Sequence, residues 1–250
     1  MKGLENKMGK LLKLEFRKLR KQKSFYICTA LMLALLLFSA VTMKQAYIGA
    51  GAAFAENALS ACSFLMFAGI FTALLVCDDY EQQTIKNIYA RGYSRSQVYF
   101  SKFISVFLAV TAIFALVELG AILLGCFYFG VEDGTGFRWL GTIAAQYAAC
   151  MANVSFYFVV SATLRKNGAA IAGVLVAPTL VSMALGLADS LLKSETVVLA
   201  NWWVAALPAA FSGQTAEAGR FVGCFLASLL YIPFFVLGGR FFQKKLEGVF

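Results

Sequence analysis

Long apolar runs dominate the chain, and short polar or charged connections separate them. A helix needs about 20 predominantly apolar residues to cross a bilayer core about 30 Å thick. Six runs meet this requirement, and we predict a transmembrane helix in each of them: 25–43, 58–76, 104–129, 139–163, 168–187 and 221–238. The pattern therefore predicts an all-α integral membrane protein in which residues 1–250 form a single transmembrane domain.

The composition agrees with this interpretation and excludes several kinds of enzyme. Hydrophobic residues make up 60% of the chain and charged residues 14%, whereas a soluble domain is about half apolar and a quarter charged. The absence of histidine excludes Ser-His catalysis and histidine-bound zinc hydrolases. The chain also has no G-x-x-x-x-G-K-[ST] loop for nucleotide phosphates, so any ATP that drives it must be hydrolysed by another chain. The scattered cysteines suggest no metal site and are interpreted as small apolar residues.

Lys and Arg are distributed very unequally between the two sets of connections. Of the 22 basic residues, 18 lie before the first span, after the second and fourth spans, or after the sixth. Because cytoplasmic connections are enriched in Lys and Arg, this asymmetry predicts that both termini are cytoplasmic. The net charge of +9 is therefore interpreted as a topological signal. No nucleic-acid partner is predicted, since such binding needs a basic face on a folded domain.

Residues 1–24 form a basic segment with helical periodicity. Leucine, methionine and phenylalanine recur on one side of the projected helix, and most Lys and Arg side chains fall on the other. This pattern predicts an amphipathic helix that lies in the membrane interface. The alternative is a simple basic flank that only sets topology. Glu15 falls within the apolar stripe, so we expect it to face protein rather than lipid.

The loop 77–103 carries signals for two successive helices. Its acidic residues Asp78, Asp79 and Glu81 are interpreted as the start of a short helix, because acids suit a helix amino terminus. Gly92 then interrupts the pattern. A capping box formed by Ser94 and Gln97 predicts the start of a second helix that continues into the third span. The resulting helix, turn and helix would suit partner docking, and the alternative is a solvated connector.

Polar residues inside the predicted spans indicate a candidate substrate path. Glu118 lies near the middle of the third span, and Gln146 and Asn153 lie on one polar stripe of the fourth. A carboxyl group at this depth suggests a substrate path or proton coupling. The structural alternative is a neutral Glu118 that is hydrogen-bonded to Asn153 or Gln146. Residues 188–220, between the last two spans, contain Trp202 and Trp203 and are predicted to form short external or re-entrant helices.

Two segments resemble those of type-2 ATP-binding-cassette (ABC) exporter permeases. The first resembles the interfacial elbow helix of that family and reads Leu14-Glu15-Phe16-Arg17-Lys18-Leu19-Arg20. The second resembles its cytoplasmic coupling helix and the start of its third span, through Glu81, Thr84, Ile85, Lys86, Gly92, Ser94, Arg95 and Lys102. A glycine commonly precedes the threonine in such loops, and Gln83 occupies that position here.

The resemblance implies a non-catalytic permease subunit in the bacterial plasma membrane. It would pair with a second copy or a similar permease and bind ATPase subunits that hold ATP and Mg²⁺. The small size and the L-E-x-x-K-L start resemble the branch that exports antimicrobial peptides or gives immunity to them. The residues expected to dock the ATPase are Glu15, Glu81, Lys86, Arg91, Tyr93 and Arg95. The alternative function is a self-contained or proton-coupled carrier that uses Glu118.

Overall fold

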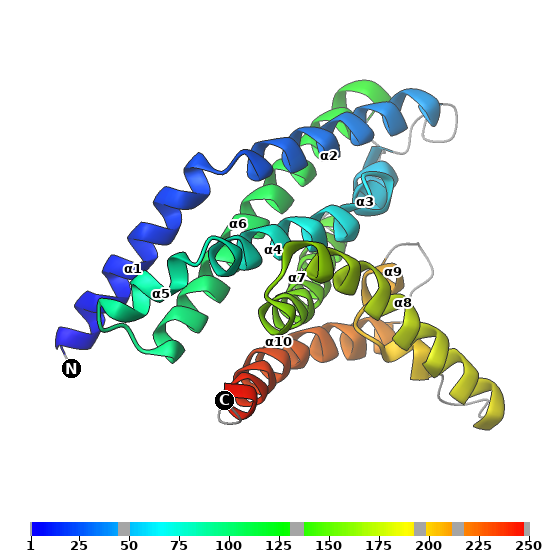
Figure 1. Ribbon diagram of the computed structural model, residues 1–250. Helices are drawn as coiled ribbons and strands as arrows, with labels where there is room; N and C mark the ends of the chain where they lie inside the picture. Colours follow the sequence, from blue (N-terminus) through cyan, green and yellow to red (C-terminus); the bar gives the residue numbers. More distant parts are fainter. Residues whose placement is uncertain (1, 45–50, 131–137, 193–198, 212–217, 248–250) are drawn as a thin grey trace.

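The computed structural model describes residues 2–44, 51–130, 138–192, 199–211 and 218–247, and these residues form helices and turns without a strand (Figure 1). Five of the described helices are long and apolar enough to cross a membrane. They are α2 (Lys23–Thr42), α6 (Arg95–Leu124), α7 (Arg138–Leu164), α8 (Asn167–Leu192) and α10 (Ala218–Glu247). The prediction of an all-α membrane protein is confirmed.

A bent pair of helices supplies the sixth candidate crossing. Helices α3 (Gly51–Ala61) and α4 (Phe64–Glu81) meet at an angle of 41°. The break lies at Ser63, whose φ of 52° is in the left-handed region that a non-glycine residue seldom adopts. The predicted span 58–76 runs across this break. The α3–α4 pair is long and apolar enough for one further crossing if both helices belong to it.

The amino-terminal segment forms a helix separate from the first span. Helix α1 (Lys2–Lys21) ends one residue before α2, and Gln22 between them has an extended backbone. Lys10, Lys13 and Arg17 are exposed, and Leu11 on the apolar side is buried. The predicted amphipathic helix is present, and part of its apolar side packs on protein.

Helix α7 lies at the centre of the bundle. In its most apolar stretch of 18 residues, 67% of the residues are buried, whereas the corresponding share is 17% in α8 and in α10. It packs against α4, α6, α8 and α10. The polar stripe predicted on α7 points into this core and comprises Gln146, Cys150, Asn153, Tyr157 and Ser161, all of which are buried. Exposed apolar side chains cover α8 and α10, as expected of helices that face lipid.

The segment between α8 and α10 folds back onto the bundle. It contains a 3₁₀ turn, η3 (Leu199–Trp202), and a short helix, α9 (Leu207–Ala210). Leu207 and Phe211 are fully buried against α7 and α10. The Asn153 amide donates a hydrogen bond of 2.7 Å to the Val204 carbonyl. Asn153 lies in the middle of α7, so this segment reaches into the interior of the bundle.

Candidate functional site: the helix junction at the basic end

One end of the bundle joins α1, α4, α6 and a short helix, α5 (Thr84–Ala90), and we call it the basic end (Figure 1). Asp78, Asp79 and Glu81 lie in the last turns of α4, not in the first turn of α5. The prediction that these acids begin the loop helix is therefore wrong. Helix α4 continues to Glu81, and Gln83, with a φ of 54°, then turns the chain sharply into α5.

The turn after α5 and the start of α6 follow the sequence signals closely. Gly92 has a φ of 78°, a left-handed conformation that glycine adopts without steric cost. The Ser94 hydroxyl accepts a hydrogen bond from the Gln97 N–H, and the Gln97 side chain accepts one from the Ser94 N–H. The predicted capping box is confirmed. The helix, turn and helix predicted for this loop are present, although the first helix is shorter than expected.

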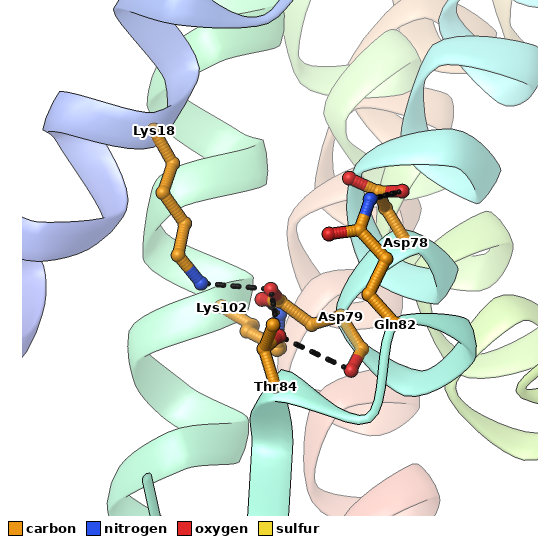
Figure 2. Close-up of polar contacts among 6 residues, drawn as sticks. All are labelled: Lys18, Asp78, Asp79, Gln82, Thr84 and Lys102. Carbon is orange, nitrogen blue, oxygen red and sulfur yellow. Dashed lines mark hydrogen bonds and ion pairs between the residues drawn. The ribbon is translucent and has the colours of Figure 1, made fainter. Parts of the chain in front are cut away.

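The carboxylate of Asp79 binds side chains from the other helices of this junction (Figure 2). Asp79 accepts a bond of 2.7 Å from the Lys18 ammonium group of α1 and forms a second ion pair with Lys102 of α6. The Thr84 hydroxyl, at the start of α5, donates to the same carboxylate at 2.7 Å. Asp79 is 8% exposed and Lys102 is 3% exposed, so the charges are compensated by one another rather than by water. The Asp79 carboxylate thus connects four helices.

Apolar packing reinforces these contacts on the inner side of α5. Ile85 and Ile88 of α5 form one cluster with Leu11 of α1 and Val98 of α6. Glu15 is only 3% exposed, which confirms that it faces protein. Its burial prevents direct contact with an outside partner, so any part that Glu15 plays in docking is indirect.

Further hydrogen bonds join this junction to the rest of the bundle. Both carboxylate oxygens of Glu81 accept bonds of 2.7 Å from Asn167, one from its backbone N–H and one from its side chain. Glu81 therefore holds the end of α4 against the start of α8. The Tyr99 hydroxyl donates to the Val236 carbonyl at 3.0 Å and joins α6 to α10. These bonds connect α4 with α8 and α6 with α10.

The outer side of the junction is basic and exposed. Lys86, Arg91 and Arg95 are exposed, and Tyr93 between them is half-buried. Glu81 is exposed at the same end but is bound to Asn167. The structure therefore groups five of the proposed docking residues around α5 and its turn, whereas Glu15 is buried.

Sequence reasoning did not assign a role to Lys18 or Lys102 and assigned Asp79 only to a helix start. The partners of Asp79 lie 61 and 23 residues away in the chain, so no local spacing marks them. The sequence did contain one indication: Lys102 stands at the start of a long apolar run. An ammonium group so close to lipid needs a counter-charge.

The three candidate path residues are buried, but the structure gives them different surroundings. Among the described residues, neither carboxyl oxygen of Glu118 has a hydrogen-bond partner. The side-chain nitrogen of Asn153 donates to the Ala149 and Val204 carbonyls, and that of Gln146 donates to the Glu56 carbonyl at 2.7 Å. The bond between Glu118 and Asn153 or Gln146, which the structural alternative required, is therefore absent from the described residues. The side-chain amides of Asn153 and Gln146 donate to backbone carbonyls instead.

The left-handed backbone at Gln83 leads to a stability prediction. This conformation raises the free energy of a non-glycine residue by roughly 1–2 kcal/mol, whereas glycine adopts it without such a cost. We expect Gln83→Gly to raise the free energy of unfolding by about 1 kcal/mol and Gln83→Val to lower it by a similar amount. Thermal unfolding of the purified variants in one detergent measures both changes. The interpretation fails if glycine and valine shift the melting temperature in the same direction.

The fold and the junction define a multi-pass helical membrane protein with one short helix, α5, beside buried ion pairs at one end. The sequence profile of the ABC-2 family transporter proteins matches residues 11–186 of the 250, and the chain belongs to that family. It is a permease subunit of an ABC transporter, a kind of membrane subunit that is generally non-catalytic and works with an ATPase partner. No curated protein and no solved structure matches the chain.

Proposed function

We propose that this permease exports a hydrophobic or amphipathic substrate, such as an antimicrobial peptide, across the bacterial plasma membrane. ATP and Mg²⁺ are held by partner ATPase subunits, and the chain works as a dimer with a second copy or a similar permease. The basic end faces the cytoplasm, because 18 of the 22 basic residues lie in the connections assigned to that side.

The observation that carries this proposal is the two-sided construction of α5. Its outer side presents Lys86 to solvent, and its inner side is fixed to α1 and α6 by Ile85 and Ile88. A partner that binds the outer side can therefore move helices that its own atoms never touch. ATP-driven closure of two ATPases would push on α5, and the Asp79 contacts would pass that motion to the spans.

Charge reversal on this outer surface tests the docking proposal. We expect Arg91→Glu to reduce the ATPase that co-purifies with the tagged permease by about tenfold or more, since like charges across an interface are strongly unfavourable. Lys86→Glu should act in the same direction. The measurement is Mg²⁺-dependent ATP hydrolysis by the purified complex, normalised to permease.

Lys44→Glu is the matched control, because it reverses an exposed charge after α2 at the opposite end. It should leave the co-purified ATPase unchanged. Equal losses from Lys44→Glu and Arg91→Glu would contradict docking at α5. Transport by the permease alone that depends on a proton gradient and is lost in Glu118→Gln would instead support the carrier alternative.

A further inference from the structure

An open pocket lies at the carboxyl end of α1, close to where the chain turns into α2 (Figure 1). Its volume is about 480 Å³, and it is lined by Arg17, Arg20 and Lys21. Residues that are three and four apart lie on the same side of a helix, so these three side chains share one face of α1. The pocket is therefore a basic site, and its size is within the usual range for a small ligand, about 300–1,000 Å³.

The three cations have no counter-charge in the described part of the chain. Arg17, Arg20 and Lys21 are exposed, and none of their side chains forms an ion pair or a hydrogen bond with another described residue. Lys18, in the same turn, differs because it points to protein and binds Asp79 (Figure 2). Like charges at this spacing repel one another, so an anion between them is favoured.

Hydrogen bonds hold the turn beside the pocket in a fixed shape. The Gln22 N–H donates to the Leu19 carbonyl at 3.1 Å, and the Phe25 N–H donates to the Gln22 carbonyl at 3.2 Å. The Tyr26 hydroxyl donates to the Arg20 carbonyl at 3.0 Å. The backbone that carries the basic side chains is thus ordered before any ligand binds, which lowers the entropic cost of binding.

An apolar surface begins directly beside the basic site. Tyr26, whose hydroxyl contacts Arg20, is exposed, and the exposed side chains of Ile27 and Leu31 continue this surface along α2. A free phosphate would use only the basic side chains. A phospholipid uses both parts, because its phosphate lies in the membrane interface and its acyl chains lie beside apolar residues. The pairing of the two surfaces therefore favours a lipid.

We propose that this pocket binds the headgroup of an anionic phospholipid in the leaflet at the basic end. Arg17 and Arg20 donate to the phosphate oxygens, which suit the planar guanidinium group, and Lys21 adds a third positive charge. An acyl chain lies along Tyr26 and Ile27. The bound lipid thereby holds the end of α1 from which Lys18 reaches the junction. This inference does not depend on which substrate is transported.

Photolabelling with two lipids tests the site. The full-length protein is placed in phosphatidylcholine nanodiscs with a trace of diazirine-bearing phosphatidylglycerol or of diazirine-bearing phosphatidylcholine with the same acyl chains. We expect labelling of residues 16–31 to be about tenfold stronger for phosphatidylglycerol, since each nearby basic residue favours an anionic lipid about fivefold. Unlabelled phosphatidylglycerol should compete for the labelling. Equal labelling by the two lipids, or labelling without competition, overturns the proposal, and neither result requires a variant.

Arg20→Gln/Lys21→Gln should reduce the preference for phosphatidylglycerol about tenfold. The matched control, Lys10→Gln/Lys13→Gln, removes two exposed charges from the same helix outside the pocket. It should reduce the preference about twofold or less, because residues 13 and 20 are about 10 Å apart along a helix, roughly one Debye length. Equal losses from the two variants would mean general attraction to a basic helix and would overturn the pocket.

Soluble glycerol phosphate is the arm that separates a lipid from a free phosphate compound. It carries the same charged group without acyl chains, so we expect it not to compete with the photolabel. Full competition by glycerol phosphate would overturn the assignment to a lipid. Labelling is measured without ATP or ATPase. A negative result therefore leaves the co-purification result intact, and loss of ATPase docking does not affect labelling.

Discussion

Asp79→Asn should destabilise the protein by roughly 3–5 kcal/mol, which is the usual effect of removing one partner from a buried ion pair. The substitution leaves the Lys102 ammonium group 3% exposed without its counter-charge. It also weakens the contacts of α4 with Lys18 and Thr84. We expect low yield in the membrane fraction, a large fall in the melting temperature and loss of the associated ATPase.

Asp78→Asn is the matched control, since it changes the neighbouring carboxylate. Asp78 accepts a hydrogen bond from the side chain of Gln82, the residue that follows its helix, and is only half-buried, so its loss should cost about 1 kcal/mol or less. Similar melting temperatures for the two variants would show that the Asp79 carboxylate does not hold the junction.

The double variant Asp79→Leu/Lys102→Met separates stability from coupling. Replacing a buried ion pair with apolar residues is often neutral or stabilising, and Lys18, with a side chain 37% exposed, can remain hydrated. If this variant folds and binds the ATPase but no longer transports, the ion pairs transmit motion. If it also transports normally, their role is confined to stability.

The features that could be predicted from the sequence are those encoded locally. Ser94 and Gln97 are three residues apart, and the two bonds of their capping box depend on little else. The exposed position of Lys86 opposite Ile85 and Ile88 follows from helical periodicity in the same way. The apolar runs long enough to cross a membrane likewise predicted the spans, because their length does not depend on which helices they pack against.

The features that could not be predicted depend on distant contacts or on backbone strain. Asp79 looked like a helix-starting acid because nothing near it in the chain indicates Lys18 or Lys102. The break at Ser63 lies in an apolar run of ordinary composition, and no glycine or proline marks its left-handed backbone. A cavity of about 160 Å³ beside that break is lined by Ser63, by Gln146 and by Pro208, which come from segments far apart in the chain. Its lining was therefore visible only in three dimensions.

Gly51→Ala should destabilise the other end of the bundle by about 3 kcal/mol, the upper part of the range for overpacking. Helix α6 ends in a π-helix, η2 (Gly125–Phe129), and Gly51 begins α3 directly against it. An added Cβ at Gly51 would lie 2.4 Å from the Gly125 carbonyl oxygen and 2.5 Å from that of Gly130. Both obstacles are backbone atoms, so no change of side-chain rotamer relieves the clash.

Gly186→Ala is the control, because an added Cβ there meets no atom within 4 Å and alanine favours helix by up to about 1 kcal/mol. Its melting temperature should be unchanged or higher, while that of Gly51→Ala falls by several degrees. Equal values would mean that α3 can move away from η2 at little cost. A fall confined to Gly51→Ala would show that α3 is held closely against η2 at the end of α6.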